Sequence, residues 1–155
     1  MLYAAFKTVH ILSIVVWVGG MVFAHFFLRP AVATLEPPQR LRLMDEVLRR
    51  FFAVVSGVAL LTFFTGVAMI GRVAKETVQA GGSFAMPLDW TVMSVLGTLM
   101  VLIYGHIRIV LYRRLHQAVQ SQDWATAGTH LGQLRQWVLV NLVIGLFLIA
   151  FTLLV

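Results

Sequence analysis

Residues 2–28 read LYAAFKTVHILSIVVWVGGMVFAHFFL, and this stretch decides the fold. Its apolar run is interrupted only by Lys7, His10 and His25. The stretch exceeds the ~20 apolar residues that a helix needs to cross the hydrocarbon core of a membrane. A secretory signal would be shorter, with basic residues ahead of its apolar core and a small-residue cleavage site behind it. We therefore expect residues 2–28 to form a retained transmembrane helix.

The composition of the chain leads to the same class of protein. Of the 155 residues, 60% are apolar, 12% are charged and none is cysteine. A soluble domain is about half apolar and about a quarter charged, so this chain cannot cover a water-facing surface. Further apolar stretches of suitable length lie at residues 51–71, 88–111 and 137–155. We predict an all-α, four-helix transmembrane bundle that forms one domain over residues 1–155.

The net charge of +6 is distributed unequally between the connections. Lys7, Arg72 and Lys75 belong to one side of the predicted bundle, and nine arginines belong to the other. Basic residues accumulate on the cytoplasmic side, so both termini are expected to face the periplasm of a bacterial inner membrane. Topology and anionic lipid headgroups then account for the basic residues, and no basic stripe remains for nucleic acid. The nine arginines are Arg29, Arg40, Arg42, Arg49, Arg50, Arg108, Arg113, Arg114 and Arg135.

Helical spacing places the polar groups of the first span on one face. Lys7, His10, Trp17, Met21 and His25 share a stripe at about 100° per residue. Ionisable groups inside a membrane are costly and tend to face the bundle interior or a cavity, so this stripe is expected to point inward. The same reasoning predicts that Asn141, in the fourth span, faces the bundle interior. The opposite face of the first span suits lipid or close helix contact and carries Leu12, Val15, Val16 and Gly19.

The histidines are the strongest candidates for a functional site. His10 and His25 are 15 residues apart, or ~22 Å along the axis, so they cannot share one site. His106 lies near the inner end of the third span, at about the level of His25, which predicts an inner pair. His116 is expected to be a solvated loop residue. The simpler alternative for His10 is a hydrogen bond across helices to Asn141 or to a threonine.

Motifs in the first span resemble a known family. The Lys7-Thr-Val-His10 and Trp17-Val-Gly-Gly sequences are similar to the opening helix of the copper-resistance D (CopD)-like superfamily of bacterial inner-membrane proteins. Residues 135–145 of the fourth span also resemble that family. The resemblance implies a four-helix bundle of the plasma membrane that is connected with copper uptake or with haem-based redox chemistry.

A related group, the HemJ-type protoporphyrinogen oxidases, shares the Lys-x-x-His opening and a Tyr–His ending in the third span, as in Tyr104-Gly-His106. In that group the opening histidine is a haem ligand, a role that the resemblance would carry over to His10. Ser94 stands about where the group has a lysine, so this chain departs from its pattern. Four-helix di-haem cytochromes b are similar in layout, with histidines near both membrane faces.

The leading hypothesis is a b-type haem protein, and so a membrane oxidoreductase, that exchanges electrons with a periplasmic or quinone partner. His10 would ligate an outer haem, and His25 with His106 an inner one. Lining residues of the cofactor would include Lys7, Trp17 and Asn141.

The alternative hypothesis is copper permeation. Thioethers and imidazoles suit Cu(I), and the seven methionines of the chain include three near the outer side. Methionine is also ordinary apolar filler. A third hypothesis is a cofactor-free structural subunit, in which the histidines only link helices. A homodimer is compatible with all three. The candidate metal ligands across these hypotheses are His10, His25, His106, Met69, Met86 and Met93.

Overall fold

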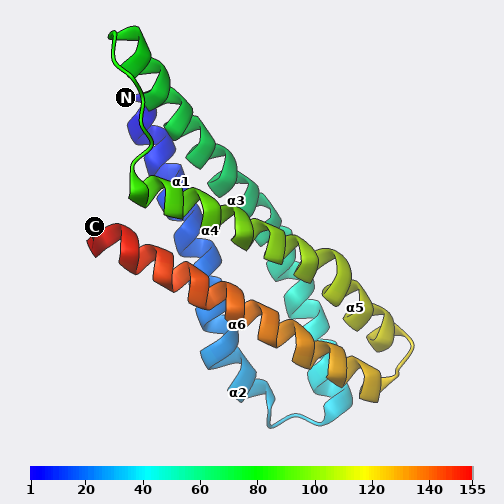
Figure 1. The fold of residues 1–155 in the computed structure, drawn as a ribbon. Coiled ribbons are helices and arrows are strands. Elements are labelled where there is room, and N and C mark those ends of the chain that lie inside the picture. The colour runs from blue at the N-terminus through cyan, green and yellow to red at the C-terminus, as the bar shows by residue number, and fades with distance from the viewer. Residues whose placement is uncertain (155) are drawn as a thin grey trace.

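The computed structural model describes residues 1–154, and within that range every regular element is a helix (Figure 1). The predicted all-α class is therefore confirmed. Two short segments, η1 and η2, are π-helical turns inside longer helices. The elements in chain order are α1 (Leu2–Val22), η1 (Phe23–Leu28), α2 (Arg29–Val32), α3 (Pro37–Gln79), α4 (Leu88–His106), η2 (Ile107–Leu111), α5 (Tyr112–Gln120) and α6 (Trp124–Leu154).

These elements join into four continuous helices, each apolar and long enough to cross a membrane. They confirm the four predicted spans, although each helix extends beyond its apolar segment. The second helix begins at Pro37, because two prolines suit the first turn of a helix and no breaker follows before residue 51. The fourth begins at Trp124. The end of the fourth predicted span, Val155, lies outside the described residues.

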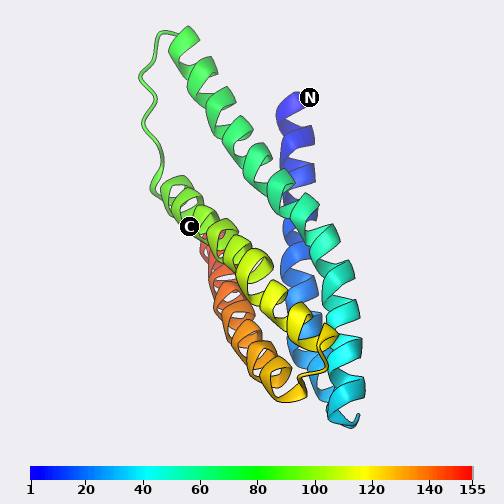
Figure 2. The same cartoon turned by 90° about the vertical axis from the view of Figure 1, so that its right-hand side faces the viewer.

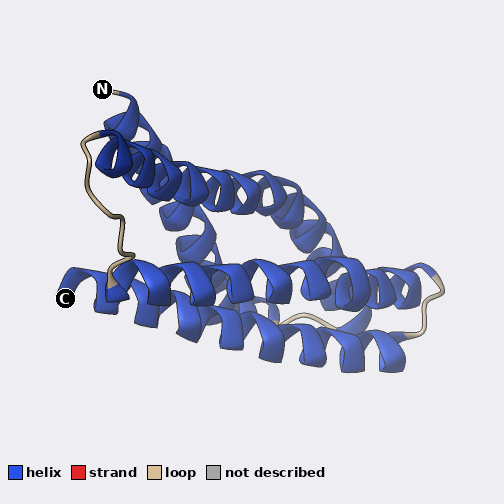
Figure 3. Cartoon of the chain, turned by 45° about the horizontal axis from the view of Figure 1, so that its top comes forward, coloured by secondary structure: helices blue, strands red, loops and turns tan. Residues whose placement is uncertain are grey.

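The helices form two antiparallel hairpins (Figures 1 and 2). The first joins α1 and α2 to α3, and the second joins α4, η2 and α5 to α6. Both hairpin loops, residues 33–36 and 121–123, lie at one end of the molecule, which we call the inner end. Both chain ends and the connecting loop, residues 80–87, lie at the outer end. Figure 3 shows the hairpins as two layers.

The hydrophobic core is concentrated toward the inner end. On α3 the buried residues run from Leu41 to Thr65, and none of residues 66–79 is buried. On α4 the first buried residue is Met100. The hairpins therefore pack closely at the inner end, whereas their outer halves bury few side chains.

Aromatic and polar contacts join the two hairpins in the middle of the bundle. The Tyr104 hydroxyl of α4 donates to the Phe52 carbonyl oxygen of α3 at 3.0 Å and lies 2.7 Å from the Ser56 hydroxyl. Trp17 of α1 packs edge-on against the Tyr104 ring, with centroids 5.8 Å apart. Hydroxyl groups that hydrogen-bond across helices are a common way of joining helices in a membrane.

The predicted faces of α1 are confirmed in the middle of the helix, whereas Lys7, which was predicted to point inward, is exposed. Trp17 and Met21 are 3% and 2% exposed, whereas Leu12 and Val15 on the opposite face are 59% and 61% exposed. The π-helical turn η1 precedes Pro30, whose ring would clash with the carbonyl four residues earlier in a regular helix. A wider turn at this point relieves that clash.

Candidate functional site

His10 forms a cross-helix contact at the outer end of the first hairpin. Its Nδ1 lies 3.0 Å from Oγ1 of Thr65 on α3. The Thr65 hydroxyl donates its single proton to the Leu61 carbonyl oxygen of its own helix. With that proton on Leu61, Oγ1 accepts from His10, which favours the tautomer with its proton on Nδ1 and a lone pair on Nε2. This is the threonine contact that the simpler alternative for His10 predicts.

A glycine makes room for the His10 ring. A Cβ atom built at Gly66 would lie 3.2 Å from His10 Cε1 and 3.7 Å from Nδ1, so the imidazole packs against the backbone of α3. Few real Cβ contacts are as tight as 3.2 Å. Gly66 and Thr65 thus fix the position of the ring and the direction of its hydrogen bond.

This arrangement is suited to metal binding. Histidines that ligate a metal through one nitrogen commonly donate the other N–H to a neighbouring acceptor, which fixes the tautomer and the ring orientation. His10 has that second contact already, in a half-buried position. Lys7, one turn farther out on α1, is exposed. Trp17 lies two turns deeper and packs against Tyr104, so the structure does not bring Lys7, His10 and Trp17 into one cluster.

The three candidate methionines are distributed over three outer segments. Met69 is half-buried on α3, one turn beyond Thr65, and Met93 is half-buried on the outer half of α4. Met86 is 37% exposed in the loop between these helices. Thioethers on separate segments suit a series of weak contacts better than a closed cage.

The inner histidines each have an aromatic neighbour. His25 lies on η1 edge-on to Phe26, with ring centroids 4.9 Å apart. His106, at the end of α4, is exposed and lies 5.4 Å from the Trp137 ring of α6. Within residues 1–154, no group of three or more His, Asp or Glu side chains could hold a metal ion. No contact between His25 and His106 is present in the described residues, and their pairing on one haem stays a prediction.

Asn141 faces inward, as the sequence predicts. It lies on α6 and is only 1% exposed, and its Oδ1 has no hydrogen-bond partner among the described residues. One turn farther out, a Cβ at Gly145 would lie 3.0 Å from Met100 Cε and 3.1 Å from Val18 Cγ2, so α6 passes close to α1 and α4 there. A buried amide oxygen without a partner is unusual in folded proteins.

The structure corrects the expectation for His116 and shows a polar cluster that the sequence reasoning missed. His116 lies on α5 instead of in a loop, and its Nδ1 is 2.9 Å from Oδ2 of Asp45 on α3. The Asp45 side chain is only 10% exposed. Tyr112, one turn before His116, donates to the Asp45 carbonyl oxygen at 3.4 Å. Tyr112 and His116 are four residues apart, so on a helix they share one face. This spacing is the sequence signal that could have indicated a common partner such as Asp45.

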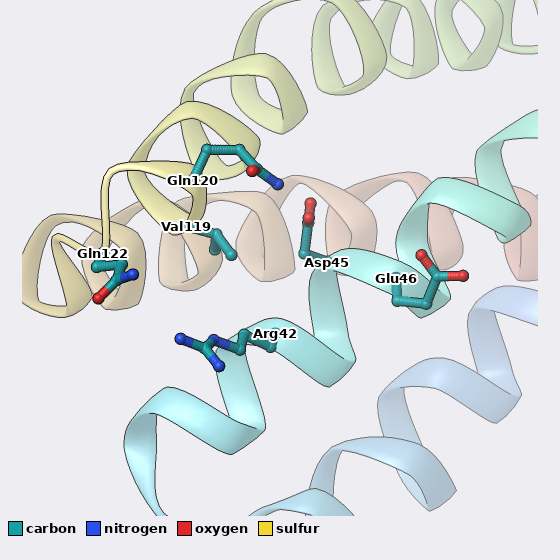
Figure 4. Close-up of a pocket in the computed structure, with 6 residues that line it drawn as sticks. All are labelled: Arg42, Asp45, Glu46, Val119, Gln120 and Gln122. Carbon is teal, nitrogen blue, oxygen red and sulfur yellow. The ribbon is translucent and has the colours of Figure 1, made fainter.

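A shallow hollow of about 280 Å³ lies beside this cluster between α3 and the end of α5. Figure 4 shows Asp45 directed toward α5 and Glu46 directed away from the hollow. Glu46 accepts hydrogen bonds from Arg49 and Arg50, which lower the pKa of its carboxyl group to about 2. The residues that line the hollow are Arg42, Asp45, Glu46, Val119, Gln120 and Gln122.

Comparison with known proteins identifies a family. The model of the family described as copper resistance protein D matches residues 45–155, which are most of the chain and include α4 to α6. The match begins after the first span, so it does not include the motifs around His10 and is independent of them. Neither the curated proteins nor the solved structures contain a match. The match points to copper, and it supports neither haem binding nor a HemJ-type or cytochrome b relationship. The chain belongs to the copper resistance protein D family and is a multi-pass protein of the inner membrane.

Proposed function

We propose that this protein passes copper ions into or across the inner membrane, with His10 as a ligand at the outer end of the bundle. The observation that carries the proposal is the contact between His10 Nδ1 and Thr65 Oγ1, which leaves Nε2 with a free lone pair. Membership of the copper resistance protein D family supports copper as the metal.

The available donor atoms suit copper as a transported ion. Imidazole nitrogen and thioether sulfur are ligands that Cu(I) accepts. Met69, Met86 and Met93 belong to the same end of the molecule as His10. An ion that has to move on needs sites that bind it well enough to enter and weakly enough to leave. One imidazole and separate thioethers on different segments meet that requirement.

A Cu(I) competition assay on the purified protein tests the role of His10. We expect His10→Ala and His10→Gln to weaken Cu(I) binding about tenfold or more, because a carboxamide is a poor ligand for this metal. The matched control is His130→Gln, since His130 is half-buried on the inner part of α6 and contacts only Gln133 in the described hydrogen bonds. That variant should bind Cu(I) like the wild type.

The same samples distinguish copper from haem and from a structural role. Copper accumulation by cells should fall for both His10 variants and stay normal for His130→Gln. Wild-type Cu(I) binding in His10→Gln would contradict the proposal and leave His10 as a helix contact. A Soret band in the purified protein, with sharp bands on reduction, would favour the haem hypothesis instead.

A further inference from the structure

His116 and Asp45 join α5 to α3 near the inner end of the bundle. The His116 Nδ1 lies 2.9 Å and 3.1 Å from the two carboxylate oxygens of Asp45. An ionised carboxylate can only accept a hydrogen bond, so the imidazole proton lies on Nδ1. The hydrogen bonds of the described residues use only this nitrogen of His116. The neutral ring therefore has a free lone pair on Nε2, as the ring of His10 does.

The packing of α5 on α3 holds this pair in place. Tyr112, one turn before His116, packs edge-on against the Phe52 ring, with centroids 5.2 Å apart. Leu115, the residue before His116, is fully buried. The Asp45 side chain is 10% exposed and is directed toward α5 (Figure 4), whereas the His116 side chain is 42% exposed. The carboxylate thus lies behind the ring, and the imidazole reaches the surface.

A carboxylate behind an imidazole is a common arrangement around metals in proteins. Ligating histidines usually donate their second N–H to a carboxylate, a carbonyl or water, which orients the ring and raises the basicity of the ligating nitrogen. Asp45 gives His116 this support with a charged acceptor, whereas Thr65 gives His10 a neutral one. The geometry of His116 therefore suits metal binding through Nε2.

Helix α3 carries the supporting group of both histidines. Asp45 and Thr65 are 20 residues apart on this continuous helix, which corresponds to ~30 Å along its axis, about the thickness of the hydrocarbon core. Asp45 precedes the apolar stretch 51–71, and Thr65 lies within it. His116 thus belongs at the headgroup level of the inner end, and His10 lies inside the outer half. One helix positions an imidazole toward each side of the membrane.

We propose that His116 is a second copper ligand, at which the ion leaves the bundle at its inner end. This inference rests on the proposed function, because it supplies the other end of the path that begins at His10. A site with one protein ligand binds the ion weakly and leaves its other coordination positions to the molecule that takes the ion over. Arg113 and Arg114, in the turn before His116, are exposed and repel a cation, which also favours release.

Chemical modification of the detergent-solubilised wild-type protein tests the proposal without a substitution. Diethyl pyrocarbonate acylates unprotonated imidazole, and mass spectrometry of the digested protein gives the rate at each histidine. At free Cu(I) about ten times the Kd of the site, we expect the His116 rate to fall about tenfold, because the unoccupied fraction falls by that factor. His130 is the internal control, because it is half-buried on the inner part of α6 beside the neutral amide of Gln133. Its rate should not change.

The same digest reports on His10, so failure of the inner site and failure of the proposed function are distinguishable. Protection of His10 alone would overturn the inner site and leave the proposed function standing. Protection of neither His10 nor His116 would overturn both. Equal protection of His116 and His130 would indicate binding to any accessible imidazole and would also overturn the inner site.

A substitution separates the role of a ligand from that of a helix contact. The amide of glutamine can donate to Asp45 but is a poor copper ligand, so His116→Gln keeps the contact between the hairpins and removes Nε2. We expect copper accumulation by cells to fall as it does for His10→Gln, while Cu(I) protection of His10 and the unfolding temperature stay at their wild-type values. Normal accumulation in His116→Gln would overturn the role of His116 in release.

Discussion

At the scale of single residues, Thr65 decides which nitrogen of His10 is free. Its hydroxyl donates to the Leu61 carbonyl and accepts from His10 Nδ1. Valine has nearly the same shape but cannot accept, so Thr65→Val would leave the Nδ1 proton without its partner. We expect the Cu(I) affinity to fall about tenfold, the lower end of the effect of such supporting contacts. The measurement is the Cu(I) competition assay.

Thr62 is a control for this change, because its hydroxyl donates only to the Val58 carbonyl of its own helix. Thr62→Val removes one hydroxyl from the same stretch of α3 and should leave Cu(I) affinity unchanged. Equal losses of Cu(I) affinity in Thr65→Val and Thr62→Val would mean that the polarity of α3 matters for binding and the tautomer of His10 does not.

A second residue-scale prediction concerns acid pH. Arg49 and Arg50 hold the pKa of Glu46 at about 2, below its ordinary value of 4.5. Since the pKa is lower in the folded state, the stabilisation is complete above about pH 4.5 and is lost as the pH falls toward 2. Carbon-13 NMR titration of the Glu46 carboxyl should show the low value. Arg49→Gln should move it toward 4.5, whereas Arg113→Gln, at an exposed arginine of α5, should not.

The sequence was sufficient to orient single polar residues but not to pair them. His10 and Asn141 face inward as predicted, because exposing a polar group of an apolar span to lipid is costly. The partner of His10 lies 55 residues away, and its identity depends on the register between α1 and α3. His116 was misplaced for a similar reason: its carboxylate partner, Asp45, is 71 residues away.

At the scale of whole helices, hydropathy predicts where the chain crosses the membrane but not where each helix ends. The apolar stretch 51–71 is flanked by polar residues on both sides, yet α3 continues through them from Pro37 to Gln79. An amphipathic segment without helix breakers can continue a helix beyond its apolar part, with its polar face toward water. Only residues 121–123 separate α5 from α6.

The close approach of α6 to two other helices gives a prediction at this scale. A Cβ at Gly145 would meet Met100 Cε and Val18 Cγ2. The methionine can move, but valine is stiff at χ1. We expect Gly145→Ala to be about 1 kcal/mol less stable than Gly132→Ala on the same helix, because both gain the same helix propensity and only Gly145→Ala adds overpacking. Thermal unfolding of the two detergent-solubilised variants measures this difference.

Gly132 is a suitable reference because nothing lies within 4 Å of the Cβ position there. Its alanine variant should keep or slightly raise the unfolding temperature of the wild type. Equal unfolding temperatures for the two variants would show that α6 can shift away from Val18 at little cost.

At the scale of the whole molecule, the two hairpins are joined mainly in the middle and at the inner end of the bundle. The contacts of Tyr104 with Phe52 and of His116 with Asp45 both cross between them. The outer halves of α3 and α4 bury no side chain beyond Thr65 and before Met100. Weakly packed regions open at low free-energy cost. The His10 end is therefore the part of the bundle best able to admit an ion.

The last prediction concerns the direction in which the bundle is inserted. The structure places both chain ends and residues 80–87 at one end, and residues 33–36 and 121–123 at the other. Nine arginines lie toward the latter end and three basic residues toward the former, so we expect the former to face the periplasm. Alkaline phosphatase fused after Val155 should be active, and the same enzyme inserted at residues 121–123 should be inactive. The opposite pattern would place His10 on the cytoplasmic side, and the proposed copper path would then begin inside the cell.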